Sequence, residues 1–174
     1  MPESVHIVEV SPRDGLQNEA GFLATEVKLE LIARLIGCGL HCIEATAFVS
    51  PKWVPQMADA AELYARLPTG LDCRFPVLVP NLQGYRRAMD AGVREIAVFS
   101  AASEPFSLKN TNAGIDDGLI RIREVCEHAH HDGIAVRGYV STVLGCPYQG
   151  KVDVGTVVDV AAKLHAMGCY EISL

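Results

Sequence analysis

The chain alternates between segments with helical hydrophobic periodicity and short apolar runs, and a glycine separates each helical segment from the run that follows. In the first of these segments Val27, Leu31 and Leu35 fall on one helical face. The apolar runs begin at five glycines: Gly39, Gly70, Gly92, Gly133 and Gly168. A glycine directly after a helix can take the left-handed conformation that ends it. The pattern therefore predicts five helices, each closed by one of these glycines and followed by a strand.

An apolar segment near residues 5–10 adds a sixth strand at the start of the chain. Alternation of strands and helices with short connections predicts a parallel sheet with right-handed crossovers. Two α/β architectures fit this order: an open, doubly wound sheet and a (β/α)8 TIM barrel. The open sheet usually has a glycine-rich phosphate loop after its first strand, where this chain has Arg13-Asp14-Gly15. Polar residues also end the other strands, as on the catalytic face of a barrel, so we favour the barrel.

The 174 residues are interpreted as the N-terminal part of a single catalytic TIM-barrel domain, residues 1–174, with about six parallel strands and five helices. The sixth predicted strand is interrupted at Leu174, whereas a complete barrel takes about 250 residues. We therefore expect the C-terminal part of the barrel to follow in a longer protein. An unclosed barrel exposes an apolar edge, so we expect this portion alone to fold poorly.

The composition supports the α/β class, and the net charge limits the kinds of partner that we expect. A hydrophobic fraction of 49% with only 6% aromatic residues suits a buried parallel sheet. The net charge of −6 argues against nucleic acid and membrane partners, because such surfaces are bound by clustered lysine and arginine. No apolar run approaches the roughly 20 residues of a membrane span, and no signal sequence is evident. We expect a cytoplasmic protein, although a processed mitochondrial enzyme would look alike.

Cysteine and histidine usage gives little evidence for a metal or nucleophile site. The six cysteines contain no C-x-x-C pair, as expected for reduced structural thiols. Cys146 could be a nucleophile, but no histidine is close and the segment 145–150 also suits a tight turn. His128 and His131 share a face near the end of a predicted helix, where the helix dipole favours cations, so we interpret them as surface residues.

The densest group of reactive side chains follows the first predicted strand. Seven consecutive positions contain Arg13, Asp14, Gln17 and Glu19. The backbone of a tight turn does not require this combination of charged and amide side chains. A carboxylate at the end of a barrel strand can bind Mg²⁺ or Mn²⁺, and a neighbouring guanidinium can hold a carbonyl or carboxylate with two hydrogen bonds. An ion pair in a structural turn is the alternative. We favour an active-site loop.

Two other polar residues are candidates for the same site. Glu44 follows an apolar run, so its carboxylate should pair with Arg13 or take part in catalysis. Asn110 lies in a long polar connection after the fourth predicted strand, and long loops in compact domains are often functional. The segment 48–57 contains the only tryptophan and suits either a loop over a ligand or one packed on the barrel rim.

Six motifs together resemble those of the 3-hydroxy-3-methylglutaryl-CoA lyases, which belong to a superfamily of metal-dependent TIM-barrel lyases and synthases. The motifs are VEVSPRDGLQNE at 8–19, FVSPKWVPQM at 48–57, PVLVPN at 76–81, AASE at 101–104, RGYVS at 137–141 and LGCPY at 144–148. The resemblance covers nearly the whole chain. An Arg-Asp-Gly alone would mark only the superfamily, whereas the first two extended motifs are typical of the lyases.

The resemblance implies cleavage of 3-hydroxy-3-methylglutaryl-CoA to acetyl-CoA and acetoacetate. It implies that Arg13 contacts the substrate carbonyl, that Asp14 binds the divalent metal (Mg²⁺ or Mn²⁺) and that Glu44 supports catalysis. It also implies that Gln17 and Asn110 line the substrate site, that a small-molecule acyl-CoA is the partner, and that a homodimer is a possible assembly of the full-length protein. The family's remaining metal ligands and catalytic cysteine would lie beyond residue 174, so we expect this portion alone to be inactive.

Two alternatives stay open from the sequence. A related aldolase or Claisen-type synthase would run similar chemistry on 2-oxo acids. A protein of another class, a non-catalytic module that binds acyl-CoA or metal, would keep the fold without the reaction.

Overall fold

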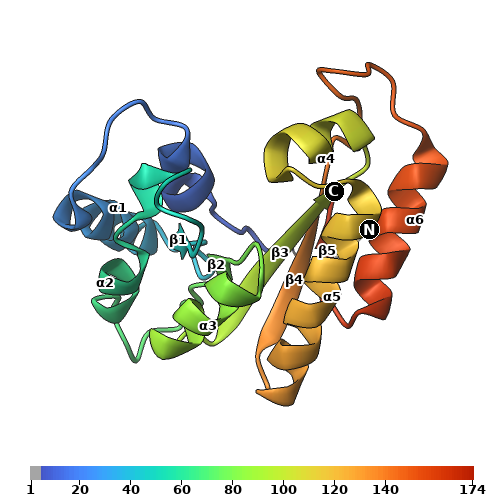
Figure 1. Ribbon diagram of the computed structural model, residues 1–174. Helices are drawn as coiled ribbons and strands as arrows, with labels where there is room; N and C mark the ends of the chain where they lie inside the picture. Colours follow the sequence, from blue (N-terminus) through green and yellow to red (C-terminus); the bar gives the residue numbers. More distant parts are fainter. Residues whose placement is uncertain (1–4) are drawn as a thin grey trace. The chain divides into compact units, whose positions relative to one another are not determined.

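The computed structural model describes residues 5–174 and has an α/β fold whose sheet contains five strands, ordered as in the chain from β1 to β5. It divides into two compact units (Figure 1). Of the described residues, the first unit comprises 5–79 together with 83–95, and the second comprises 80–82 and 96–174.

The first unit is built on two short strands covered by helices. In chain order it contains η1 (Ser11–Gly15), α1 (Thr25–Gly37), β1 (Thr46–Ala47), η2 (Pro55–Met57), α2 (Ala60–Ala65), β2 (Val77–Leu78) and, apart from its first residue, α3 (Leu82–Asp90). β1 and β2 are parallel, with Thr46 opposite Val77. The buried core joins α1 and α2 to the segment before β1 through Ile32, Ile43 and Leu63, all fully buried. This packing fixes the backbone that carries the candidate site.

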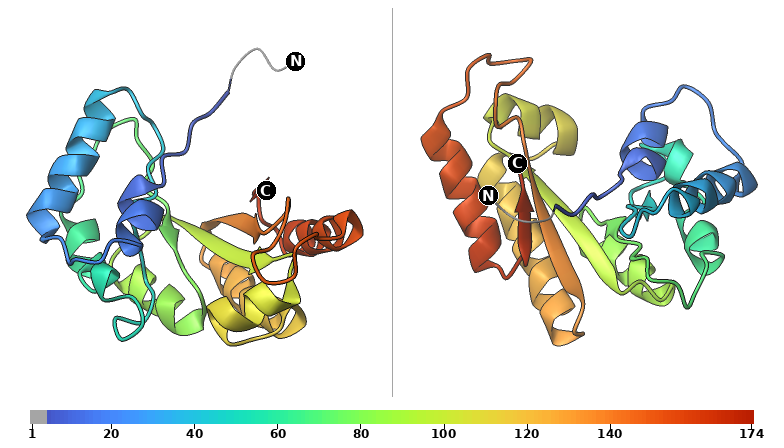
Figure 2. Two further views of the ribbon diagram at one scale, coloured as in Figure 1. Left: turned by 90° about the horizontal axis from the view of Figure 1, so that it is seen from above. Right: turned by 180° about the vertical axis from the view of Figure 1, so that it is seen from behind.

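The second unit has longer strands. It contains β3 (Glu95–Ala101), α4 (Glu104–Thr111), α5 (Ile115–His131), β4 (Ala135–Ser141), α6 (Val154–Ala166) and β5 (Glu171–Ser173). β4 and β5 are parallel, with Arg137 opposite Glu171. Both α5 and α6 pack against β4 (Figure 2). The parallel strand pairs in both units agree with the predicted α/β class.

The glycines that were predicted to end helices have the expected backbone conformation. Their φ angles are all positive: 87° at Gly39, 76° at Gly70, 80° at Gly92, 70° at Gly133 and 88° at Gly168. The first of these follows α1, where its N–H donates to Ile36 at 2.9 Å. The prediction is confirmed for the four glycines that follow the ends of α1, α3, α5 and α6, whereas α2 already ends at Ala65, five residues before Gly70, so Gly70 does not close it.

The structure corrects the predicted number of strands and helices. The expected strand at residues 5–10 is reduced to a single parallel bridge between Glu9 and Ile43. It ends there because the helical turn η1 begins at Ser11, with Pro12, which lacks an N–H, as its second residue. The described residues therefore contain five strands rather than six.

The connection after the fourth predicted strand contains a helix that the sequence analysis missed, so residues 5–174 form six α-helices rather than five. Helix α4 begins after Ser103, whose hydroxyl accepts a hydrogen bond from the N–H of Phe106 at 3.3 Å. Serine is a favoured residue at this position, and Pro105 in the first turn has the φ angle a helix needs. Asn110 therefore lies in a helix and not in a loop.

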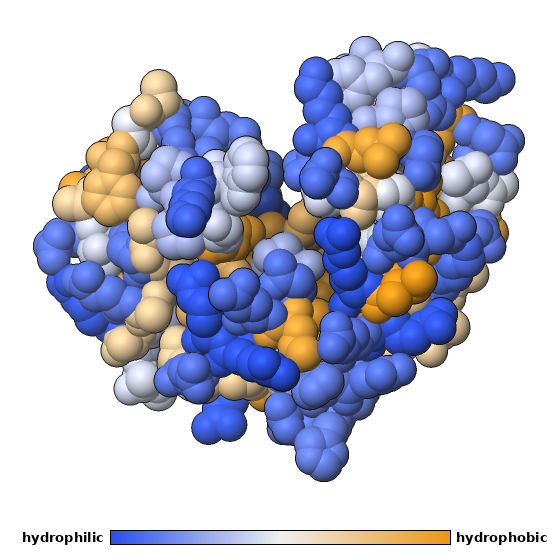
Figure 3. Space-filling view, in the orientation of Figure 1, coloured by the Kyte–Doolittle hydropathy of each residue, from blue (hydrophilic) through white to orange (hydrophobic). Residues whose placement is uncertain are grey.

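The surface is largely hydrophilic in the view of Figure 3, with separate apolar patches. None of the helices formed by residues 5–174 combines the length and the apolar composition that crossing a membrane would require.

Candidate active site

The centre of the site is a buried ion pair between Arg13 and Glu44. The Nε of Arg13 donates to Oε1 of Glu44. The Glu44 side chain is 0% exposed and that of Arg13 is 10% exposed. A charge buried this deeply needs an opposite charge beside it, and Arg13 and Glu44 provide this for each other. The predicted pairing of the two residues is confirmed.

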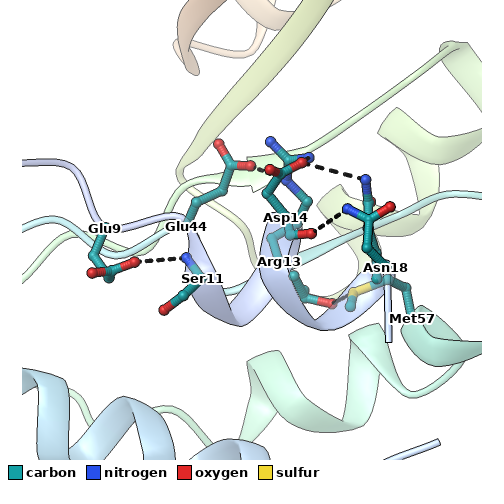
Figure 4. Close-up of polar contacts among 9 residues, drawn as sticks. Glu9, Ser11, Arg13, Asp14, Asn18, Glu44 and Met57 are labelled. Atoms are coloured by element: carbon teal, nitrogen blue, oxygen red, sulfur yellow. Dashed lines mark hydrogen bonds and ion pairs between the residues drawn. The ribbon is translucent and has the colours of Figure 1, made fainter. Parts of the chain in front are cut away.

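The backbone of the first unit brings these two residues together. The N–H of Glu9 donates to Cys42 at 2.9 Å, and the N–H of Glu44 donates to the carbonyl of Glu9 at 2.7 Å. The chain then turns, because the carbonyl of Val10 accepts from the N–H groups of both Arg13 and Asp14. Instead of the predicted loop, a helical turn carries the guanidinium back toward Glu44 (Figure 4).

Asp14 forms the exposed edge of the same cluster. Its Oδ1 accepts from Nη1 of Arg13 at 2.8 Å and lies 3.5 Å from Nε2 of Gln17. Its backbone carbonyl accepts from the side chain of Asn18 at 2.7 Å (Figure 4). The Asp14 side chain is 53% exposed. Arg13 therefore lies between a buried carboxylate and one that faces solvent.

Glu9 stabilises the start of the turn. Its Oε1 accepts from the N–H of Ser11 at 2.7 Å. This backbone hydrogen bond, followed by one from the Ser11 side chain, lowers the pKa of Glu9 below its ordinary value. Glu9 was read only as part of a motif in the sequence, and the signal that could have revealed its role is a carboxylate two residues before a helical turn.

The chemistry of Asp14 fits a divalent cation. Carboxylate oxygens are the ligands that Mg²⁺ and Mn²⁺ prefer, and this carboxylate is accessible while its neighbour Glu44 is fully buried against Arg13. Within residues 5–174 no three His, Cys, Asp or Glu side chains come together as a metal site. At this site the described residues thus supply the accessible carboxylate of Asp14 without a cluster of three such ligands.

The segment 48–57 packs beside β1. Phe48 and Met57 are buried, and the Sδ of Met57 accepts from the hydroxyl of Thr46 at 3.6 Å. Arg87 of α3 donates to the carbonyl of Val49 at 3.1 Å. Trp53 is 87% exposed. The ends of this segment are therefore fixed in the core, while its middle faces solvent.

A buried ion pair that the sequence analysis missed lies next to this segment. Nζ of Lys28 in α1 is 2.6 Å from Oδ1 of Asp59, and the two side chains are 3% and 7% exposed. In the structure Lys28 shares the buried face of α1 with Thr25 and Ile32, a face that the periodicity of Val27, Leu31 and Leu35 did not mark. A lysine on an apolar helical face needs a buried partner.

Asn110 and Cys146 belong to the second unit. Asn110 is exposed in the last turn of α4, and its role stays a prediction. Cys146 and Gly150 exchange backbone hydrogen bonds of 2.8 and 2.9 Å, which confirms the tight turn. Burial raises the pKa of the Cys146 thiol, but hydrogen bonds from Ser103 and from the N–H groups of Tyr148 and Gln149 together outweigh it and lower the pKa.

A family model described as HMGL-like matches residues 4–174. The chain belongs to the HMGL-like family. It is 54% identical to "Hydroxymethylglutaryl-CoA lyase, mitochondrial" of Bos taurus over 99% of this chain and 53% of that protein. It is also 54% identical to "3-hydroxy-3-methylglutaryl-CoA lyase, cytoplasmic" of Mus musculus, over 100% of this chain and 51% of that protein.

Solved structures agree with the HMGL-like assignment. A hydroxymethylglutaryl-CoA lyase from Pseudomonas aeruginosa superposes with a TM-score of 0.95 at 50% identity, covering 99% of this chain and 58% of that one. An HMG-CoA lyase from Acinetobacter baumannii, solved in complex with coenzyme A and 3-methylmalate, gives a TM-score of 0.90 at 32% identity, covering 96% and 54%. The HMGL-like chain spans about half the length of the curated relatives it matches.

Proposed function

We propose that this HMGL-like chain carries part of the active site of a carbon–carbon lyase that cleaves 3-hydroxy-3-methylglutaryl-CoA to acetyl-CoA and acetoacetate. The observation that carries the proposal is the contact of Arg13 with both Glu44 and Asp14. The relatives named as lyases of this substrate support it.

The reaction needs positive charge where an enolate forms. A base removes the proton of the tertiary hydroxyl, the carbon–carbon bond breaks, and its electron pair forms the enolate of acetyl-CoA, which is then protonated. A fixed guanidinium beside the thioester oxygen stabilises that developing charge. Arg13 suits this role because Glu44 holds its Nε, so the group needs little reorganisation during the reaction. Glu44 is then a positioning residue for Arg13 and a candidate for direct participation.

The proposed cofactor is Mg²⁺ or Mn²⁺, with Asp14 as one ligand. When bound, such an ion polarises the oxygen atoms of the substrate. Asp14 keeps an accessible carboxylate for it, and Asn18 fixes the Asp14 backbone. Gln17, whose amide lies 3.5 Å from the Asp14 carboxylate, is proposed to orient substrate oxygens. Asn110 is proposed to contribute to substrate binding from α4.

The proposed partner is a small-molecule acyl-CoA, which a solved relative supports by its complex with coenzyme A. A homodimer is the proposed assembly of the full-length protein. We propose neither a nucleic acid nor a membrane partner for this acidic chain. The relatives include mitochondrial and cytoplasmic enzymes, and we propose the cytoplasm as the location.

An enzyme assay on the complete gene product tests this function. We expect acetoacetate to be released from 3-hydroxy-3-methylglutaryl-CoA in the presence of Mg²⁺ or Mn²⁺. Turnover only with a 2-oxo acid and acetyl-CoA would show a Claisen-type synthase or aldolase instead. Binding of acyl-CoA with no turnover of either substrate would show a non-catalytic module.

A further inference from the structure

In the first unit, the buried ion pair between Lys28 and Asp59 forms more hydrogen bonds than the single contact between the two charges. Both carboxylate oxygens of Asp59 are bound, Oδ1 by Lys28 at 2.6 Å and Oδ2 by the hydroxyl of Thr25 at 2.8 Å. The ammonium group of Lys28 also donates to the backbone carbonyl of Gln56 at 2.5 Å and lies 4.9 Å from the centre of the Phe22 ring.

Stability alone does not require charges at this position. Removing two charges from water is costly, and apolar residues of similar size often replace a buried pair without loss of stability. Lys28 lies between Thr25 and Ile32 on the buried face of α1, where an apolar side chain would suit the packing. What an apolar side chain could not do is bind the carbonyl of Gln56 and fix the segment that contains it.

The fixed segment leads directly to the candidate active site. The side chain of Gln56 donates from Nε2 to the backbone carbonyl of Glu19 at 2.6 Å. The neighbouring Asn18 donates from its side chain to the carbonyl of Asp14 at 2.7 Å. A continuous series of hydrogen bonds and short backbone steps therefore connects Lys28 to Asp14.

The other side of the segment is fixed as well. Met57, next to Gln56, is buried and accepts from Thr46 of β1 at 3.6 Å. Gln56 is thus held between the strand and α1, and its side chain is presented toward Glu19. A rigid neighbour that holds a reactive group in place is the usual way in which residues outside a site control its geometry.

We propose that Lys28, Asp59 and Gln56 are positioning residues, which hold the turn bearing Arg13 and Asp14 in its reactive geometry through the contact of Gln56 with Glu19. The effect on catalysis rests on the proposed lyase function. The effect on the turn does not, because it follows from the hydrogen bonds alone.

Four variants of the complete gene product test the proposal. Lys28→Met removes the ammonium group, and Gln56→Met removes the donor to Glu19 while keeping a side chain of similar length. Arg34→Met is the matched control, because Arg34 lies on the same helix but its side chain is 77% exposed and, among residues 5–174, forms an ion pair with the exposed Glu30. Lys28→Arg restores a cation at the first position.

Hydrogen exchange gives a readout that needs no substrate. The N–H groups of Asn18 and Glu19 donate to Gly15 at 3.1 Å and Leu16 at 3.3 Å. In Lys28→Met and Gln56→Met we expect these amides to exchange about five to ten times faster, the factor that matches loss of one hydrogen bond of ordinary strength. Arg34→Met should leave them unchanged, and Lys28→Arg should restore part of the protection.

Kinetics give the second readout. We expect Lys28→Met and Gln56→Met to lower kcat or the apparent Mg²⁺ affinity by about tenfold to a hundredfold, as is typical when the support of a metal ligand is removed. KM for the acyl-CoA should change less than kcat. Where Lys28→Met does not fold because Asp59 is left unpaired, the double variant Lys28→Met with Asp59→Asn removes both charges and allows the same measurement.

The two proposals fail in different ways. The positioning role would be overturned if Lys28→Met and Gln56→Met both showed the same exchange rates, or the same kinetics, as Arg34→Met. It would also be overturned if the amides exchanged faster while kcat and metal affinity stayed unchanged. A wild-type protein that releases no acetoacetate would overturn the lyase function, while the exchange of Asn18 and Glu19 would still decide whether the network holds the turn.

Discussion

At the scale of single residues, Arg13 is held by two carboxylates with different surroundings. Glu44 is fully buried, whereas Asp14 is about half exposed. The buried contact fixes the direction of the guanidinium, and the exposed one leaves a carboxylate accessible to a ligand. This division explains how adjacent residues of one turn, Arg13 and Asp14, can serve different purposes.

Glu9 should make stability depend on pH in a defined window. Its folded pKa is lowered by the hydrogen bond from the N–H of Ser11, so the folded state favours the charged form. The stabilisation is then fully present above the ordinary carboxyl pKa of about 4.3 and is lost as the pH falls through the lower folded pKa. We predict that Glu9→Gln is less stable than wild type at pH 7 and that the difference shrinks below about pH 4. Urea unfolding at several pH values measures this, and a difference that stayed constant into the acid range would contradict it.

At this scale the ion pair between residues of the recognised motifs was predictable from the sequence, whereas the ion pair that only the fold brings together was not. The pairing of Arg13 with Glu44 was expected because both residues end predicted strands. The pairing of Lys28 with Asp59 was not, because these residues are 31 positions apart and nothing in the local pattern joins them. Lysine also often covers apolar surface with its stem while its charge reaches water, so its burial could not be assumed.

At the scale of elements, the ends of helices were more predictable than their beginnings. Glycines that require positive φ are visible in the sequence, and all five had this conformation. The start of α4 depends on Ser103, one of several serines and threonines that could have served, so the helix was read as a loop. The first strand was overestimated for a similar reason, since only Glu9 forms a bridge.

Alanine at three glycines should separate these effects. Gly37 is the last residue of α1 and nothing lies near a Cβ added there, so we predict that Gly37→Ala stabilises the protein by about 0.5 kcal/mol, the lower end of the gain within a helix. At Gly92 a new Cβ would meet open space, but the φ of +80° is unfavourable for alanine. We therefore expect Gly92→Ala to lower the free energy of unfolding by about 1–2 kcal/mol. Gly168→Ala should lose more, because its Cβ would collide with His130, whose Nε2 bonds to the carbonyl of Met167 at 2.9 Å.

Thermal or urea unfolding of the three glycine variants measures the order. Equal losses at Gly92 and Gly168 would show that the contact with His130 adds nothing. A loss at Gly37→Ala would show that this position does not behave as ordinary helix.

At the scale of the whole molecule, the α/β class and the family were both predictable from the sequence. The recurring helix–glycine–strand pattern gave the parallel sheet, and the motifs around residues 8–19 and 48–57 indicated the lyases, as the HMGL-like match over residues 4–174 confirms. A full set of metal ligands could not be derived, and within residues 5–174 only Asp14 is proposed as one.

Metal removal should therefore stop the reaction of the complete gene product. We predict that a chelator abolishes acetoacetate release and that Mg²⁺ or Mn²⁺ restores it, because the ion polarises substrate oxygens. Asp14→Asn should raise the metal concentration needed for half-maximal rate by about tenfold or more, since loss of a direct ligand should exceed the smaller effects of supporting residues. Full activity in chelator, or unchanged metal dependence in Asp14→Asn, would exclude Asp14 as a ligand.

The kcat of acetoacetate release tests whether the guanidinium of Arg13 stabilises the enolate. Arg13→Met should lower kcat by about 10²–10³, as loss of one oxyanion donor does. Removing Arg13 also takes away the cation that is paired with the buried Glu44 carboxylate, so the double variant Arg13→Met with Glu44→Met serves as the folding control. We predict that the double variant regains stability and that its kcat stays low. A double variant that regained wild-type kcat together with its stability would show that Arg13 serves the fold and not the reaction.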